Sequence, residues 1–252
     1  MQQERCQSVN STVPPRPVRL ISVIRKRLLG PVLAIVVSGC GSDPGALQSF
    51  AGLVRVSSLS PFPSDCVVGG QGGTNFRNAE VEPFLAVDPK DRRHLVGVWQ
   101  QDRWSNGGSN GLGSAVSFDG GHTWATGFAH FTLCSGGTTA NGATFQRASD
   151  PWVTFGADGT PHHIAFGFNN TSARQAMMAV RSLDGGRTWT EPVFLTQENN
   201  PDVGIDKETI TADPRDATHV YAVWDRLVGL AGKTVASAPI WFSRSSDAGA
   251  TW

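Results

Sequence analysis

The sequence predicts an all-β fold built from repeated four-stranded units, and three observations support this expectation. The chain of 252 residues holds 29 Gly and 15 Pro, residue types that favour turns. Eight Trp against one Tyr supply large apolar side chains that can be buried between sheets. An eight-residue pattern also recurs three times at nearly even spacing, which is typical of a repeat architecture.

The repeated pattern is S-x-D-x-G-x-T-W, and its copies start 65 and then 63 residues apart. The three copies occupy residues 117–124, 182–189 and 245–252. In a hairpin turn, an Asp side chain accepts backbone N–H bonds and Gly tolerates a positive φ. The Trp offers a large apolar body for packing between units. We therefore expect a structural role for the three aspartates, Asp119, Asp184 and Asp247.

Short apolar segments surround each copy at similar offsets and read as strands. The first unit is expected to have strands at 82–87, 95–99, 113–118 and 128–133, and the second at 150–155, 163–168, 176–182 and 192–196. The third unit is expected to have strands at 208–212, 220–224 and 240–245, and residues 53–57 read as a lone strand closing another unit. Four short strands per unit make one blade of a β-propeller.

The first 39 residues are predicted to be a signal peptide. A basic cluster at residues 25–27 is followed by an apolar run over 28–37 and then by Ser38, Gly39 and Cys40. This order resembles the lipobox of bacterial lipoproteins, which implies cleavage before Cys40 and lipid attachment to its sulfur. The alternative is an ordinary secretory signal with an incidental cysteine. Either way, we expect an exported protein of the bacterial cell envelope, as an anchored lipoprotein or an extracellular protein.

The charge balance excludes some partners. Lys plus Arg and Asp plus Glu both number 21, so no basic excess favours nucleic acid. The leader holds six basic residues and one acidic residue, so the mature part carries a net charge of −5. No apolar run approaches the roughly 20 residues of a transmembrane helix. We expect contact with the membrane through the lipid anchor only.

Cysteine use agrees with export. Cys6 lies in the leader and Cys40 is the lipidation candidate, which leaves Cys66 and Cys134 as a pair. A pair of cysteines in an exported chain predicts a disulfide. The alternative is two unpaired buried thiols.

The three copies are similar to the Asp-box, or bacterial neuraminidase repeat, and residues 76–252 resemble the sialidase superfamily. This resemblance implies a β-propeller of sialidase type, six-bladed when complete, with exo-α-sialidase activity on terminal sugars of glycans. At about 64 residues per blade, the mature chain accounts for about three blades. We therefore expect a truncated propeller, with residues 40–75 as a linker that includes the possible closing strand.

Blade topology predicts where a site lies. Residues just before each first strand share one face with the loop after each second strand, and the Asp-boxes occupy the opposite face. The resemblance places the active site on the face away from the boxes. Charged residues gather there, and residues 100–112 read as a rim loop. The candidate catalytic residues are Asp102 and Asp150; the candidate substrate-binding residues are Arg77, Glu82, Arg103, Arg147, Glu208, Asp225 and Arg226.

These residue types suit glycan chemistry, because Arg binds carboxylates bidentately and paired acids cleave glycosidic bonds. The alternative is that Asp–Arg pairs cap strand ends and join neighbouring blades. Sialidases use three arginines, an acid/base Asp and a Tyr–Glu pair. Only Phe76-Arg77 matches their first-blade motif, whereas Asp102 and Asp150 are candidates by position. Tyr221, the single tyrosine, reads as a core residue.

The sequence thus predicts a sialidase-like glycoside hydrolase with a glycan substrate. The rival interpretations are a propeller that binds carbohydrate or protein without catalysis, and a structural surface lipoprotein. We expect no cofactor and no metal, since His162-His163 lacks further ligands at metal-binding spacing.

Overall fold

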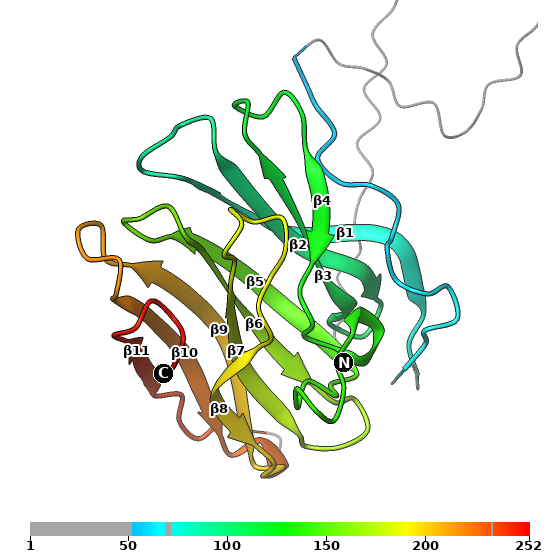
Figure 1. Cartoon of the computed structure of the whole chain (residues 1–252). Helices are drawn as coiled ribbons and strands as arrows, with labels where there is room; N and C mark the ends of the chain where they lie inside the picture. Colours follow the sequence, from blue (N-terminus) through cyan, green and yellow to red (C-terminus); the bar gives the residue numbers. More distant parts are fainter. Residues whose placement is uncertain (1–51, 69–71, 233) are drawn as a thin grey trace, which may run out of the picture. The chain divides into compact units, whose positions relative to one another are not determined.

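The computed structural model describes residues 52–68, 72–232 and 234–252 (Figure 1). The signal peptide and Cys40 lie outside the described residues. The fold is all-β, with three antiparallel units that follow one another along the chain. Two short 3-10 helices, η1 (Leu133–Ser135) and η2 (Leu230–Gly232), are the helical elements of the described part. No helix in that part is both long and apolar enough to span a membrane.

Each unit is an up-and-down sheet. The first contains β1 (Asn75–Val87), β2 (Leu95–Trp104), β3 (Ser109–Ser117) and β4 (Ala125–Phe128). The second contains β5 (Arg147–Phe155), β6 (Pro161–Phe168), β7 (Gln175–Arg181) and β8 (Val193–Glu198). The third contains β9 (Val203–Ala212), β10 (Val220–Val228) and β11 (Ile240–Ser245). A single residue pair, Ser109 with Ala148, links the first two units into one hydrogen-bonded sheet, whereas the third unit forms a separate sheet.

The Asp-boxes form the turns that follow β3, β7 and β11. In the first box, the Asp119 carboxylate accepts hydrogen bonds from Thr123 N at 2.9 Å, Thr123 Oγ1 at 2.6 Å and Ser117 Oγ at 2.8 Å. Ser117 Oγ in turn accepts from Gly121 N. The same bonds recur around Asp184 and Asp247. In each box, the carboxylate therefore ties the two ends of the turn together.

Each later box also contacts the preceding unit. The carbonyl of Gly185, in the second box, lies 2.7 Å from His94 Nε2 of the first unit. In the third box, the carbonyl of Ala248 accepts a hydrogen bond from Arg181 Nη1 of the second unit at 2.9 Å. The side chain of Trp189, in the second box, packs against the apolar clusters of the first two units. The boxes therefore join consecutive units as well as closing hairpins.

Several expected boundaries were wrong. The fourth strand of the first unit is Ala125–Phe128 and not 128–133, because pairing with β3 begins directly after the box at Ala125. Residues 53–57 form no strand. The expected rim loop over 100–112 is a tight hairpin, because β2 continues to Trp104 and β3 starts at Ser109. The expected site residues therefore lie within strands.

Cys66 and Cys134 form a disulfide whose Cα atoms lie 5.7 Å apart. It fastens the segment 57–66, which precedes β1, to the start of η1. Phe62 from this segment is buried and packs edge-on against Phe128, with ring centroids 5.4 Å apart. The segment is thus part of the first unit's core.

Candidate functional site

The first strands of the three units share an unusual backbone feature. Glu82 in β1, Asp150 in β5 and Lys207 in β9 have φ of 54°, 52° and 54°. Each sits where the pairing with the second strand shifts register. A left-handed backbone is strained for residues other than glycine, and β-bulges of this kind re-aim side chains and cluster near functional sites. The three bulges therefore mark equivalent positions in the repeat.

These bulges line one cavity of about 320 Å³. Its walls come from the same three-residue stretch of each unit. The first unit gives Glu82, Pro83 and Phe84, the second gives Asp150, Pro151 and Trp152, and the third gives Lys207, Glu208 and Thr209. We call this cavity the bulge pocket. It is the meeting point of the three units and it gathers three carboxyl groups.

Asp150 is the best-connected acid of the bulge pocket. Lys207 Nζ lies 2.5 Å from its Oδ2, so the ion pair joins the second unit to the third. The Ser149 hydroxyl donates to its Oδ1. The same contact with Asp150 raises the pKa of Lys207 and keeps its ammonium charged. Asp150 is thus bound by an ammonium of the third unit and a hydroxyl of its own strand.

Glu208 has the opposite environment. Its side chain is 2% exposed, and no other described residue donates a hydrogen bond to either of its carboxyl oxygens. Burial, with added repulsion from Asp150 and Asp206, raises the pKa of Glu208 well above its usual value. Burial and the nearby Asp150 charge also raise the pKa of Asp206. A buried carboxyl without a partner is costly when charged, so this group favours the protonated form.

Glu82 belongs to a polar network on the first unit. Gln100 Nε2 donates to its carboxylate and also to Ser149 Oγ at 2.8 Å. Arg103 Nη1 lies 3.7 Å from Glu82 Oε1 and donates to Gln100 Oε1 at 2.5 Å. Glu82 is therefore the counter-charge of Arg103 within the protein.

Two aromatic rings complete the bulge pocket. Phe84 and Trp152 follow the two prolines and stack with centroids 3.7 Å apart and planes inclined by 25°. Both side chains are half-buried. Aromatic surface beside a few polar groups is typical of small-molecule sites.

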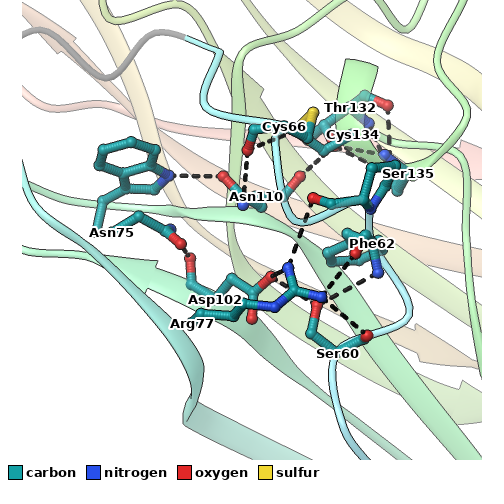
Figure 2. The surroundings of a disulfide bond; sticks show 12 residues. Ser60, Phe62, Cys66, Asn75, Arg77, Asp102, Asn110, Thr132, Cys134 and Ser135 are labelled. Carbon is teal, nitrogen blue, oxygen red and sulfur yellow. Dashed lines mark hydrogen bonds and ion pairs between the residues drawn. A yellow bond between two sulfur atoms is a disulfide. The ribbon is translucent and has the colours of Figure 1, made fainter.

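Asp102 and Arg77 lie elsewhere, under the segment 57–66 (Figure 2). Asp102 is fully buried in β2, where it accepts hydrogen bonds from Ser60 Oγ at 2.6 Å and Asn78 N at 2.7 Å. Arg77 donates to the carbonyl of Phe62 at 2.9 Å and lies 3.7 Å from Asp102. Neither residue lines the bulge pocket. Both were expected at the site, but in the structure they hold the disulfide-bonded segment in place.

Arg147 is likewise occupied by the protein. Its side chain is fully buried in β5, although it was expected to bind substrate. It donates to Asn106 Oδ1 at 2.6 Å and to the carbonyl of Gly107 at 2.7 Å, and it packs over the Trp104 ring. These contacts fix the turn between β2 and β3, so Arg147 does not face the pocket.

The remaining expected residues sit on β10. Asp225 pairs in register with Asp206 of β9, and its charge helps to raise the pKa of that residue after burial and Asp150. Arg226 donates to Glu198 Oε2 of the second unit at 3.0 Å. Neither residue lines the bulge pocket.

The structure thus brings together Glu82, Asp150 and Glu208 from the expected set, with Arg103 beside Glu82. Sequence reasoning missed Phe84 and Trp152 as pocket residues. A signal was present, because Glu82-Pro83-Phe84 and Asp150-Pro151-Trp152 repeat an acid–Pro–aromatic order at equivalent places. Proline has no N–H to donate, which suits a bulge without ladder pairing.

Known proteins resemble this chain in structure but not in sequence. No protein-family model matches the chain. No curated protein sequence matches it either.

Among solved structures, the α-L-arabinanase of Penicillium chrysogenum, complexed with arabinobiose, aligns with a TM-score of 0.50 at 16% identity. The alignment covers 78% of this chain and 51% of that one. A Hadza microbial sialidase aligns at 0.48 and 21% identity, covering 69% and 36%. A GH93 α-L-arabinofuranosidase of Fusarium graminearum aligns at 0.47 and 14%, covering 69% and 48%.

The chain therefore spans between about a third and a half of the length of these structures. At these sequence identities the likeness concerns the fold alone. The fold assignment uses the arabinanase, whose TM-score is 0.50. Together with the three consecutive four-stranded units and their boxes, this likeness assigns the all-β architecture to the β-propeller class.

Proposed function

We propose that this chain is the pocket-bearing part of a propeller glycoside hydrolase. The observation that carries the proposal is the pair of unlike acids in the bulge pocket. Glu208 is buried, unpartnered and held toward its protonated form, whereas Asp150 binds the Lys207 ammonium and the Ser149 hydroxyl. Two carboxyl groups with opposed environments in one cavity are the arrangement that acid–base glycosidases need.

The proposed roles follow from these environments. Both Glu208 carboxyl oxygens are covered by protein atoms. Once these atoms move aside, Glu208 donates its proton to the glycosidic oxygen as the bond to the anomeric carbon breaks. Asp150 accepts a proton from the attacking water, whose oxygen forms the new bond to that carbon. Lys207 forms an ion pair with Asp150, and the Phe84–Trp152 pair offers apolar surface to a sugar ring. The products are two sugars that together contain the elements of the added water.

The test is hydrolysis of a glycoside panel by the full chain. The panel contains arabino-oligosaccharides, neutral hexosides and α-sialosides. Glu208→Gln keeps the shape but removes the proton donor, so kcat is expected to fall by about 10²–10⁴-fold. In the unaltered chain, kcat is expected to fall as pH rises through the raised pKa of Glu208, because the proton donor is then lost.

Glu191→Gln is the matched control, since Glu191 lies on the surface beside His130, away from the bulge pocket. Its hydrolysis rate should equal that of the unaltered chain. A Glu208→Gln variant that keeps full activity would contradict the proposed role.

The more specific expectation, exo-α-sialidase, rests on the Asp-boxes and on Phe76-Arg77. It requires arginines on the substrate carboxylate, and it predicts turnover of the α-sialosides in the panel. The second candidate is a glycan-binding propeller without catalysis, favoured by the burial of Asp102 beneath the segment 57–66. Measurable sugar binding without turnover of any panel member would support this second candidate.

We also propose export with a lipid on Cys40. Mass spectrometry of the mature protein from a bacterial host should show a diacylated N-terminal Cys40. Cys40→Ser should move the protein from the membrane to the soluble fraction. An unmodified Cys40 within an intact leader would contradict this proposal.

A further inference from the structure

The bulge pocket is acidic. Three of its nine lining residues are carboxylic acids, Glu82, Asp150 and Glu208, and one is basic, Lys207. The Lys207 ammonium is bound to Asp150 and lies 4.0 Å from Asp206 as well. No unpaired cation therefore lines this cavity among the described residues. A negatively charged sugar entering it would meet the Glu82 carboxylate, which is 43% exposed, and would compete with Asp150 for the Lys207 ammonium, which is 65% exposed.

The arginines near this face already bind other groups of the protein. Arg77 is bound to the carbonyl of Phe62, Arg147 to the turn between β2 and β3, and Arg226 to Glu198. Arg103 is the arginine next to the pocket wall. It pairs with Glu82 and donates a hydrogen bond to Gln100. Its side chain is still 29% exposed, so solvent and ligands can reach part of it.

A second observation points to a ligand with hydroxyl groups. Both carboxyl oxygens of Glu208 are buried in the pocket wall without another described residue as donor. A protonated carboxyl donates one hydrogen bond and still accepts others. Sugar hydroxyls both donate and accept, so a sugar brings no charge to this group when the protein atoms that cover the two oxygens move aside.

We propose that the bulge pocket selects a sugar ring without a carboxylate, and that Glu82 sets this selectivity by occupying Arg103. This inference rests on the proposed function and names its substrate class. Glu82 takes the place on Arg103 that a ligand carboxylate would need, and its own charge repels that carboxylate. Selectivity then comes from repulsion as well as from fit. The inference disfavours the sialoside reading of the Asp-box resemblance.

The test compares matched sugars that differ only at C6. The probes are the 4-methylumbelliferyl galactoside and galacturonide, and the glucoside and glucuronide, in both anomeric forms. The full chain is titrated with each probe, and binding is followed by ligand-observed NMR, which requires no turnover. We expect the neutral member of a pair to bind at least about tenfold more tightly, since like-charge juxtaposition is strongly unfavourable in a partly buried site.

Glu82→Gln should then reduce the ratio of neutral to carboxylated affinity by about tenfold or more, because it removes the repelling charge and frees Arg103. Glu80→Gln is the matched control. Glu80 lies on the same strand, but it bonds to Ser57 and lines a different cavity. This variant should leave the ratio unchanged.

The outcomes separate the two proposals. Equal or tighter binding of the uronides by the unaltered chain would overturn the inference and leave the proposed function standing. An unchanged ratio in Glu82→Gln would overturn the role of Glu82. If none of these probes binds, the inference is overturned, whereas the proposed function fails only if the arabino-oligosaccharides and the other members of the glycoside panel are not hydrolysed either.

Discussion

At the scale of single residues, four of the six described non-glycine residues with a positive φ occupy positions that recur between the units. The other two, Asn78 and Asp102, are hydrogen-bonded to each other. Glu82, Asp150 and Lys207 hold a left-handed backbone at the pocket, and Ala248 does so in the third Asp-box with φ of 56°. The first group has side chains that line a cavity, whereas the Ala248 methyl has no such role. A left-handed residue whose side chain lines no cavity should be replaceable by glycine without a loss of stability.

Ala248→Gly is therefore expected to stabilise the protein. The equivalent residues of the other boxes are Gly120 and Gly185, with φ of 78° and 77°. Relief of the left-handed strain, less the entropy cost of glycine, should raise the free energy of unfolding by up to about 1 kcal/mol. Urea denaturation measures this. The reverse change, Gly120→Ala, should lower it by about 1 kcal/mol, since an added Cβ there meets no atom within 4 Å and costs only strain. A destabilised Ala248→Gly would contradict this account.

Two adjacent histidines predict sensitivity to mild acid. Burial lowers the pKa of His162 and of His163 to about 4, against 6.5 when exposed. Between these values the unfolded chain binds more protons than the folded one, so stability should fall as pH decreases from about 6.5 to 4. Each histidine contributes at most about 3 kcal/mol to this loss. The measurement is Tm against pH. In the double variant His162→Gln, His163→Gln the slope over this window should be shallower, and an unchanged slope would refute the assignment.

At the scale of elements, the segment 57–66 depends on a few strong contacts. It forms no strand, yet it supplies Phe62 to the core and carbonyl or hydroxyl groups to Arg77 and Asp102. The disulfide to Cys134 limits how far this segment can move when the chain unfolds. The cross-link spans 68 residues, a separation at which restriction of the unfolded chain is substantial.

Replacing both cysteines by serine should lower the free energy of unfolding by about 2–4 kcal/mol. Guanidinium denaturation is the measurement, with hydrogen exchange over 57–66 as a local readout. Reduction of the unaltered protein should reproduce the effect, whereas the variant should not respond to reductant. An unaltered protein that is equally stable after complete reduction would contradict this prediction.

The strands show how much the sequence could predict at this scale. The three units, their order and their turns were readable, because Asp, Gly, Thr and Trp recur with fixed chemical tasks. The C-terminal end of β2 was not, because Gln100, Gln101 and Asp102 read as a polar loop but are buried within the strand. Gln100 and Gln101 pair there with β3. Polar residues that are buried by hydrogen-bonding to distant segments leave no periodic signal in the sequence. The bulges could not be predicted from the sequence either, because the register of a strand depends on its partner strand.

At the scale of the whole described region, two units expose apolar sheet surface. On β11, Ile240, Trp241 and Phe242 are 67%, 47% and 60% exposed, and on β1 Leu85 is 54% exposed. Within the described residues β11 is an edge strand. Edges of this kind favour pairing between chains.

The 252-residue chain is therefore expected to self-associate at micromolar concentrations in the way exposed apolar edges do. Light scattering after size-exclusion chromatography measures the mass. The double change Ile240→Thr, Phe242→Thr should shift it toward the monomer while leaving the β-sheet signal in circular dichroism unchanged. A strictly monomeric unaltered chain would show that these surfaces do not drive association.

The candidate site was predictable in part. Topology grouped Glu82, Asp150 and Glu208, and these residues do line one cavity, although they lie within the first strands and not at their starts. The arginines could not be placed from sequence, because their partners are carbonyls and carboxylates that only the folded chain brings near. Charge type alone therefore suggested a pocket for anions, whereas the assembled pocket is acidic.

Because the bulge pocket takes walls from two sheets that share no ladder hydrogen bonds, a bound sugar would restrain motion of the third unit against the first two. Occupancy would then appear as slower amide exchange along β9, far beyond the few atoms in contact. Loss of the Lys207–Asp150 ion pair would have the reverse effect and loosen that joint. Recognition and internal motion are in this way coupled through the same three bulges.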